Sequence, residues 1–242
     1  VLRTSLMPGQ LKALAYNQSH RVDDVRLFEI GTVFLPAPDG QLLPDEREHV
    51  AVALAGLEAP AAVAVLDVLD DALAFPNLQL RAAEPSGMHP TRSAEVVIAG
   101  KVRGQVGEVD PAVLASFGVD GPVAWFELDL GSVLRGPFGN RKYKPVSKYP
   151  SSDIDLAFEV PESVPAAAVE GSLRKGGGAL LVGLELFDVY RGPGVAEDSR
   201  SLAYRLRFQA PDRTLTDAEV AAARSTCIST VEKQQAGAAL RA

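Results

Sequence analysis

The alternation of apolar and polar positions is clearest in the last hundred residues. Apolar residues alternate with polar ones over 154–160 and again over 202–208, which is the period of a β-strand with one buried face. A long apolar strand is expected over 180–190, and a short edge strand over 238–242. Apolar residues have helical spacing in the two remaining segments, which lie between the first and second strands and between the third and fourth. The predicted order is therefore βαββαβ, a ferredoxin-like domain with both helices on one face of its sheet.

Local capping signals predict where these two helices begin. Ser163 is expected to cap the first, with Pro165 in its first turn and a loosened end at the glycines 176–178. Thr216 and Glu219 have the spacing of a capping box, in which each side chain pairs with a free backbone amide of the first turn. The second helix is therefore expected to begin after Thr216.

Residues 1–140 predict a separate domain that mixes helices with mostly antiparallel strands. Helices are expected near Pro8, over 61–73 and after the Asp110-Pro111 cap, and strands over 25–34, 49–55, 94–99, 102–109 and 123–130. Proline, glycine and basic residues interrupt every period from about 136 onward. This predicts a linker at 141–147 and a second domain at 148–242.

Composition fits a folded protein in a reducing compartment. Hydrophobic residues make up 47% and charged residues 23% of the chain, and no apolar run approaches the roughly 20 residues of a membrane span. Cys227 is the only cysteine, so an internal disulfide is excluded, and its helical spacing predicts a small core residue. These features predict a cytoplasmic protein without a membrane partner. The start at Val1 has neither an initiator Met nor a targeting signal and predicts a fragment of a longer chain.

Charge is distributed unevenly along the chain. The formal net charge is −7, and residues 1–140 carry 10 Lys/Arg against 18 Asp/Glu, whereas residues 141–242 carry 14 against 13. The negative net charge argues against a protein that coats nucleic acid without specificity. The balanced second half leaves room for a local basic surface.

The open face of the expected ferredoxin-like sheet is the best candidate for that surface. Arg205 and Arg207 are predicted to point there, beside Asp153 and Asp155. Such a face can hold unpaired bases through aromatic stacking and phosphates through basic groups. The same pattern also fits solvated ion pairs with no ligand.

Catalytic and metal-binding patterns are weak. The histidines lack the paired spacing of a zinc site and are expected to be surface or capping residues: His20, His49 and His89. A run of aspartates predicts a solvated acidic helix face: Asp67, Asp70 and Asp71. Gly104 and Gly107 form too short a motif for a phosphate-binding loop.

Several motifs resemble the phenylalanyl-tRNA synthetase β chain. Phe-Asp-x-Tyr-x-Gly at 187–192, Ser-Leu-Ala-Tyr at 201–204 and Arg-Thr-Leu-Thr-Asp at 213–217 are similar to its C-terminal anticodon-binding domain. Leu-Arg-Thr-Ser-Leu-Met-Pro-Gly at 2–9 and Phe-Glu-Leu-Asp-Leu at 126–130 resemble the second half of its catalytic-like module. Ile154 stands where the family often has Arg, so any role of that Arg lapses here.

The resemblance implies an α+β chain with two domains. A degenerate class II synthetase-like module with a mixed, antiparallel sheet would be followed by the ferredoxin-like anticodon-binding domain. The chain lacks the Phe-Arg-x-Glu and Gly-x-Gly-x-x-Arg motifs of ATP-activating modules. It should therefore have no catalytic residue, metal or cofactor of its own. The complete enzyme would use ATP, magnesium, phenylalanine and its tRNA, and would contain two α and two β chains.

The open face and the resemblance together predict the RNA-binding residues: Asp155, Tyr190, Arg191, Ser201, Arg205 and Arg207. Apolar docking surface for the synthetase α chain and the second β chain is expected from Leu6, Leu11 and Leu14, or from the 61–73 helix. An alternative is a ferredoxin-like protein-interaction module with no RNA role. A single-chain synthetase with its own active site is a third possibility, against which the missing motifs argue.

Overall fold

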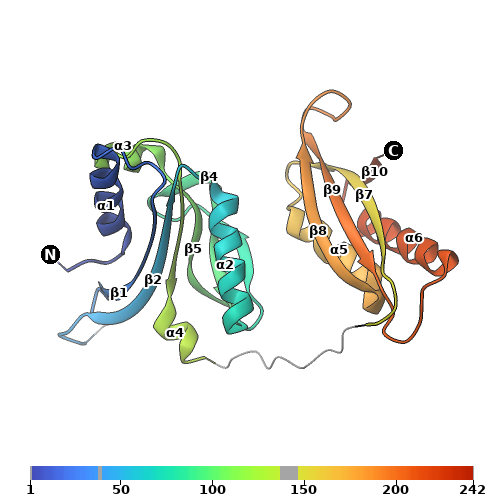
Figure 1. Ribbon diagram of the computed structural model, residues 1–242, viewed down its shortest axis with the longest axis horizontal. Coiled ribbons are helices and arrows are strands. Elements are labelled where there is room, and N and C mark those ends of the chain that lie inside the picture. The colour runs from blue at the N-terminus through green and yellow to red at the C-terminus, as the bar shows by residue number, and fades with distance from the viewer. Residues whose placement is uncertain (1, 38–39, 137–146, 242) are drawn as a thin grey trace. The chain divides into compact units, whose positions relative to one another are not determined.

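The computed structural model describes residues 2–37, 40–136 and 147–241. The chain divides into two compact units, Val1–Lys142 (unit 1) and Tyr143–Ala242 (unit 2) (Figure 1). The predicted linker at 141–147 lies outside the described residues, apart from Ser147. Each unit builds its own hydrophobic core.

Unit 1 is built on a six-stranded antiparallel sheet with the order β1-β2-β6-β5-β4-β3. Its strands are β1 (Arg26–Leu35), β2 (Asp45–Ala55), β3 (Gln79–Ala82), β4 (Met88–Ile98), β5 (Lys101–Val109) and β6 (Val123–Asp129). The sequence predicted each strand except β3, an exposed edge strand without alternating burial. Mixed α+β architecture with antiparallel pairing is confirmed.

Helices cover both faces of this sheet. They are α1 (Met7–Ser19), α2 (Ala59–Leu73), α3 (Pro111–Phe117) and α4 (Leu130–Leu134). α1 and α3 pack on the face that carries Ala51, Ala53 and Trp125, whereas α2 packs on the face that carries Val52 and Phe126. Figure 1 shows α1 and α2 on opposite sides of the strands.

The expected docking role of the α1 leucines is wrong. Leu6, Leu11 and Leu14 have no exposed surface, because they fill the core between α1 and the sheet. The Asp110 cap is confirmed: its side chain accepts a hydrogen bond from the Ala112 amide at 2.6 Å, and Pro111 is the first residue of α3.

Unit 2 has a four-stranded antiparallel sheet with the order β10-β7-β9-β8. Its strands are β7 (Ser152–Pro161), β8 (Leu181–Tyr190), β9 (Ser199–Phe208) and β10 (Ala239–Arg241). The helices α5 (Ala166–Gly177) and α6 (Asp217–Gln234) share one core with one face of the sheet (Figure 1). This is the predicted βαββαβ order.

The two helices of unit 2 begin differently from one another. The capping box of α6 is confirmed, with Thr216 accepting from the Glu219 amide and Glu219 accepting from the Thr216 amide. The expected Ser163 cap is wrong, because α5 starts at Ala166 after Pro165 and has no side-chain cap.

The end of α5 is tightly packed and not loosened as the glycines suggested. A Cβ at Gly176 would lie 2.7 Å from the Cα of Cys227 in α6, so glycine allows the two helices to approach closely. Cys227 is buried, and its Sγ donates to the Leu173 carbonyl at 3.6 Å. Burial raises the pKa of this thiol to about 11, and the predicted core role is confirmed.

Candidate nucleic-acid interface

The sheet face of unit 2 opposite the helices carries charged side chains in register, and it is called the outer face here. In β7 and β9, Asp155 lies opposite Arg205 and Asp153 lies opposite Arg207. β8 completes the first of these rows with Glu185, which lies opposite Arg205. The alternate residues of β9 face the helices and are buried: Leu202, Tyr204, Leu206 and Phe208.

Both arginines form two-pronged ion pairs with their neighbours. The Arg205 Nε and Nη2 atoms donate to the Asp155 carboxylate at 3.0 and 2.9 Å. Arg207 donates to Asp153 at 2.8 and 2.7 Å. These bonds lower the pKa of both aspartates and raise the pKa of both arginines. The arrangement is the one that the ion-pair alternative predicted.

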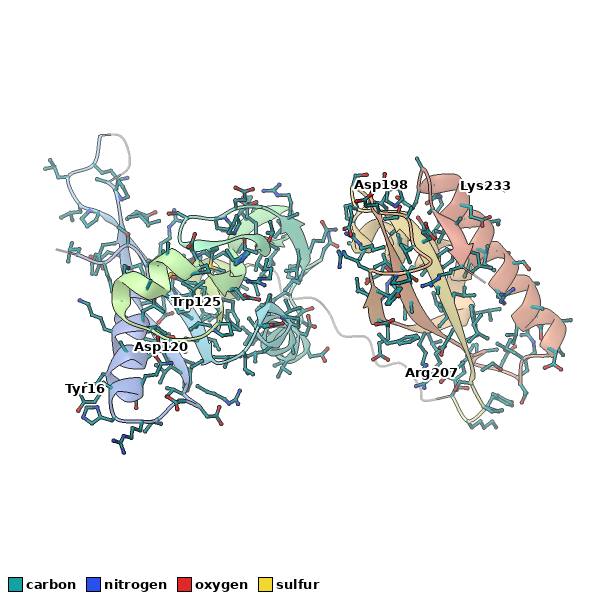
Figure 2. The ribbon with its side chains drawn as sticks, turned by 90° about the horizontal axis from the view of Figure 1, so that it is seen from above. Tyr16, Asp120, Trp125, Asp198, Arg207 and Lys233 are labelled. Carbon is teal, nitrogen blue, oxygen red and sulfur yellow. The ribbon has the colours of Figure 1, made fainter. Side chains whose placement is uncertain are left out.

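These pairs remain open to solvent. The side chains of Arg205 and Arg207 are 47% and 55% exposed. Exposed ion pairs contribute little to stability because water and salt screen them. A phosphate can therefore replace the aspartate as a partner without leaving a buried charge unpaired. Figure 2 places Arg207 toward one end of the sheet and Asp198 toward the other.

An aromatic ring lies beside one of the arginines. The guanidinium carbon of Arg205 is 5.1 Å from the centre of the Phe187 ring, which is within the range of a cation–π contact. The pairing of β8 with β9 shifts register between Leu186 and Asp188, which leaves Phe187 on the bulge. Its ring is about half exposed and offers a stacking surface. Phe187 belongs to the motif at 187–192, but its place on the outer face could not be predicted from local spacing, since a bulge depends on the partner strand.

The end of β8 is held by contacts with other segments. The Tyr190 hydroxyl donates to the Pro193 carbonyl at 3.3 Å, and Arg241 of β10 lies 5.3 Å from the Tyr190 ring centre. A Cβ at Gly192, whose φ is +157°, would lie 2.7 Å from that hydroxyl. Glycine at this position therefore lets the tyrosine fold over the following turn.

Glu162 joins the end of β8 to the start of β9. Its carboxylate accepts hydrogen bonds from both Arg191 and Arg200. The hydrogen bond from Arg191 makes the largest contribution to lowering the pKa of Glu162, and the bond from Arg200 adds to it. Together they bring this pKa to about 2. Arg191 is more than half exposed, whereas Arg200 is mostly buried and also donates to the Val164 carbonyl at 2.8 Å.

Replacing Glu162 with glutamine is expected to reduce the acid sensitivity of unit 2. Because the folded pKa lies below the usual value of 4.5, the stabilisation by Glu162 is complete above that value and is lost as pH falls toward 2. Hydrogen exchange of the β9 amides at pH 6 and pH 3 measures the effect. The variant should lose less protection than the parent, and Glu197→Gln, an exposed change in the next loop, should behave like the parent.

One predicted RNA-binding residue does not belong to the exposed surface. Ser201 lies opposite Glu159 in β7 and Tyr190 in β8, as expected for the outer face, but only 4% of its surface is exposed. The loop after β8 contacts this end of the sheet, where the Ala196 amide donates to the Glu159 carboxylate at 3.1 Å. In this conformation Ser201 is not available to a ligand.

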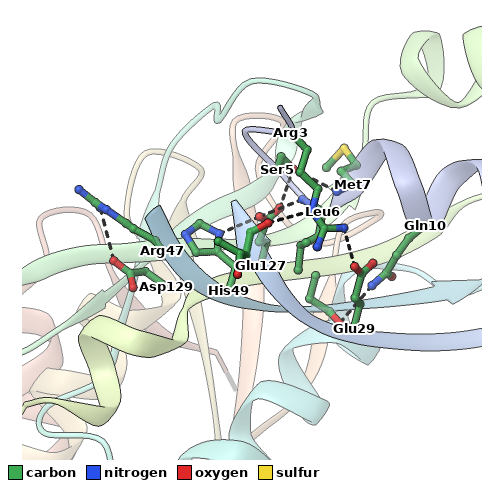
Figure 3. Close-up of polar contacts among 12 residues, drawn as sticks. Arg3, Ser5, Leu6, Met7, Gln10, Glu29, Arg47, His49, Glu127 and Asp129 are labelled. Atoms are coloured by element: carbon green, nitrogen blue, oxygen red, sulfur yellow. Dashed lines mark hydrogen bonds and ion pairs between the residues drawn. The ribbon is translucent and has the colours of Figure 1, made fainter. Parts of the chain in front are cut away.

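Unit 1 contains a second concentration of polar contacts, centred on Glu127 (Figure 3). The carboxylate of this buried residue accepts from the Ser5 hydroxyl at 2.7 Å, the Leu6 amide at 3.2 Å and His49 Nδ1 at 2.8 Å. His49 is mostly buried, so its expected surface or capping role is wrong. The network ties the segment before α1 to the centre of the sheet.

The described part of the chain holds neither a metal-binding cluster nor a membrane-spanning helix. No three or more His, Cys, Asp or Glu side chains gather there in an arrangement that would hold a metal ion. None of the helices described is both long enough and apolar enough to span a bilayer.

Comparison with known families agrees with this division of the chain. Residues 1–130 match the model described as the phenylalanyl tRNA synthetase beta chain CLM domain. Residues 147–241 match the ferredoxin-fold anticodon binding domain. The chain belongs to the phenylalanyl-tRNA synthetase β chain family. The resemblance seen in the sequence motifs is thereby confirmed.

Bacterial β subunits of phenylalanine–tRNA ligase are similar over the full chain. The chain is 36% identical to the subunit of Geobacillus kaustophilus over 255 residues, 38% to that of Moorella thermoacetica over 258 and 37% to that of Nocardia farcinica over 275. These alignments include 99–100% of this chain and 31–32% of each relative. The chain thus spans about a third of the length of these synthetase subunits.

Proposed function

We propose that unit 2 binds the anticodon region of a phenylalanine tRNA on its outer face. The observation that carries this proposal is the match of residues 147–241 to an anticodon-binding fold whose open face exposes paired arginines beside an aromatic ring. Arg205 and Arg207 would contact phosphates, and the Phe187 ring would stack on a base.

The neighbouring predicted residues take supporting roles in this proposal. Asp155 holds the Arg205 guanidinium against Phe187 until RNA arrives. Tyr190 and Arg191 border the face at the end of β8, where their side chains contact the next turn and Glu162. Ser201 is buried and would contribute only after the residues that cover it have moved.

Removing the competing carboxylates is expected to strengthen RNA binding. In the Asp153→Asn/Asp155→Asn variant, the arginines lose their ionic partners but keep their positions in β9, so the phosphates meet less competition. The affinity for a phenylalanine tRNA transcript should rise by roughly threefold to tenfold, or about 1 kcal/mol. Fluorescence anisotropy measures the dissociation constant, and the exposed pair Asp212→Asn/Asp217→Asn is the control for net charge. Unchanged affinity would mean that the outer-face arginines do not contact the RNA, and no measurable binding by either protein would favour a protein-interaction module.

We propose that unit 1 is a non-catalytic scaffold that docks other synthetase chains. Its surface has an apolar groove of about 500 Å³ between β1 and α2. Phe28 and Ile30 on β1 and Val68 on α2 are all at least half exposed along it. Exposed apolar patches of this kind commonly mark protein interfaces. The synthetase α chain and the second β chain are the proposed partners.

A charge placed in this groove is expected to weaken docking. Phe28→Asp should reduce binding of the synthetase α chain by about tenfold, because it removes an apolar contact and adds a carboxylate that must be desolvated. Leu42→Asp is the matched control, since Leu42 is fully exposed and does not line the groove. Binding measured by interferometry with purified α chain should fall only for Phe28→Asp. Equal binding by both variants would place the interface elsewhere.

The complete assembly would join phenylalanine to its tRNA in the cytoplasm, with ATP and magnesium held outside this chain. The names of the relatives and the family of unit 1 support this proposal. In that assembly, unit 2 would position the RNA and unit 1 would support the other chains.

A further inference from the structure

A row of polar side chains crosses the sheet of unit 1 where a hydrophobic core would ordinarily continue. On the face that packs against α1, successive strand partners form the row Glu29, Ala51, Glu127, Gln105, Glu95 and Arg81. Trp125 and Ala53 continue this face toward α1 and are fully buried. Glu127, in the middle of the row, is only 5% exposed, and a buried polar group is informative because it must be compensated for its desolvation.

The middle of this row forms the floor of a cavity of about 480 Å³. Glu95, Gln105, Glu127 and His49 all line it. Its remaining walls include apolar side chains: Met7, Pro8, Pro85 and Val102. Small-molecule sites typically have this size and combine apolar walls with a few polar groups.

The polar groups of the cavity have unused acceptor capacity. Arg81 donates both of its bonds to Oε2 of Glu95, at 2.9 and 2.5 Å, which leaves the other oxygen available. Within the described residues, Oε2 of Glu127 accepts the Ser5 hydroxyl alone, whereas Oε1 accepts two donors. A carboxylate oxygen can accept two hydrogen bonds, so each glutamate retains a site.

His49 adds a third acceptor. An ionised carboxylate can only accept, so Nδ1 of His49 carries the proton in its bond to Glu127. In the neutral ring, Nε2 then presents a lone pair. This nitrogen is buried and has no hydrogen-bond partner among the described residues. An unpaired buried acceptor is costly unless a ligand or water donates to it.

We propose that this cavity binds a small primary amine with an apolar body. Among the described residues, Glu95, Glu127 and His49 line it and no lysine or arginine does. Arg81 pairs with Glu95 from outside the lining, whereas no ion pair with a lysine or arginine is described for Glu127, so the charge of the cavity favours a cation. An ammonium group has three donors and no acceptor, which complements the unused acceptors. The apolar walls would hold the hydrocarbon part. This site does not depend on RNA binding by unit 2 and requires no catalysis.

Three compounds of one size test the proposal on the whole chain: 3-methylbutylamine, 3-methylbutan-1-ol and 3-methylbutanoate. Titrations followed by amide chemical shifts should give the amine a dissociation constant on the order of 1–10 mM, as expected for so small a ligand. The alcohol should bind at least about tenfold more weakly, because it lacks the charge. The acid should give no saturable shift. The shifted amides should include those of Ser86 and Gln105, which line the cavity.

A matched pair of variants distinguishes the cavity from general charge effects. Glu95→Gln should weaken amine binding about threefold to tenfold, whereas Glu29→Gln should leave it unchanged. Both glutamates lie in the same row and pair with an arginine, but only Glu95 lines the cavity. Glu127 is left intact because it anchors the Leu6 amide. Equal binding of amine and alcohol, shifts confined to other residues, or equal effects of the two variants would overturn the proposal.

Discussion

Replacing Gly104 with alanine is expected to destabilise the sheet of unit 1 strongly. An added Cβ would lie 2.1 Å from the backbone oxygen of Glu127 and 2.7 Å from Cδ2 of Leu128. Gly104 is in β5, with strands bonded on both sides, so relief requires the centre of the sheet to separate. The free energy of unfolding should fall by about 4 kcal/mol, a large part of the 5–15 kcal/mol that holds a typical domain together.

The single tryptophan makes this loss measurable. Trp125 is fully buried in unit 1, so its fluorescence during urea unfolding reports on this unit alone. Gly9→Ala is the control, since a Cβ at that position of α1 meets no atom within 4 Å. That control should leave stability unchanged or raise it by about 0.5–1 kcal/mol. A Gly104→Ala protein as stable as the control would mean that β5 and β6 are not packed as described.

Removing both outer-face arginines is expected to give the largest change in RNA affinity. Arg205→Ala/Arg207→Ala eliminates two proposed phosphate contacts and the cation–π contact with Phe187. Each arginine exchanges a carboxylate partner for a phosphate, so each contact contributes only about 1 kcal/mol to the binding free energy. Losing both contacts should raise the dissociation constant roughly 30-fold. Fluorescence anisotropy with a phenylalanine tRNA transcript measures it.

A second arginine pair provides the control for total charge. Arg174 of α5 and Arg224 of α6 are exposed and lie on the helices that pack against the inner face. Arg174→Ala/Arg224→Ala removes the same two charges and should change the affinity by less than about threefold. Similar losses in the two double variants would show that net charge, and not the outer face, governs binding.

Local rules predicted much of unit 2 from the sequence. The alternation in β7 and β9 fixes which residues face inward, because neighbouring side chains in a strand point to opposite sides. The same alternation predicted that Arg205 would lie near Asp155. The capping box of α6 involves residues three positions apart and needs no tertiary information.

Features that depend on distant neighbours could not be predicted in this way. The closeness of α5 to α6 at Gly176, and of β5 to β6 at Gly104, follows from the fold and not from local spacing. Ser201 is buried although the strand period places it on the outer face, and no local pattern specifies this burial. His49 and Glu127 are 78 residues apart in the chain, so only their strand pairing makes the cavity floor visible.

The salt dependence of tRNA binding tests most directly whether the outer face holds RNA. Phosphate contacts release bound cations, so the logarithm of the association constant falls with the logarithm of salt concentration by roughly 0.7–0.9 for each contact. The parent chain should therefore show a slope steeper by roughly 1.4–1.8 than the Arg205→Ala/Arg207→Ala variant. Identical slopes for the two proteins would contradict the account, because neither arginine would then contact a phosphate.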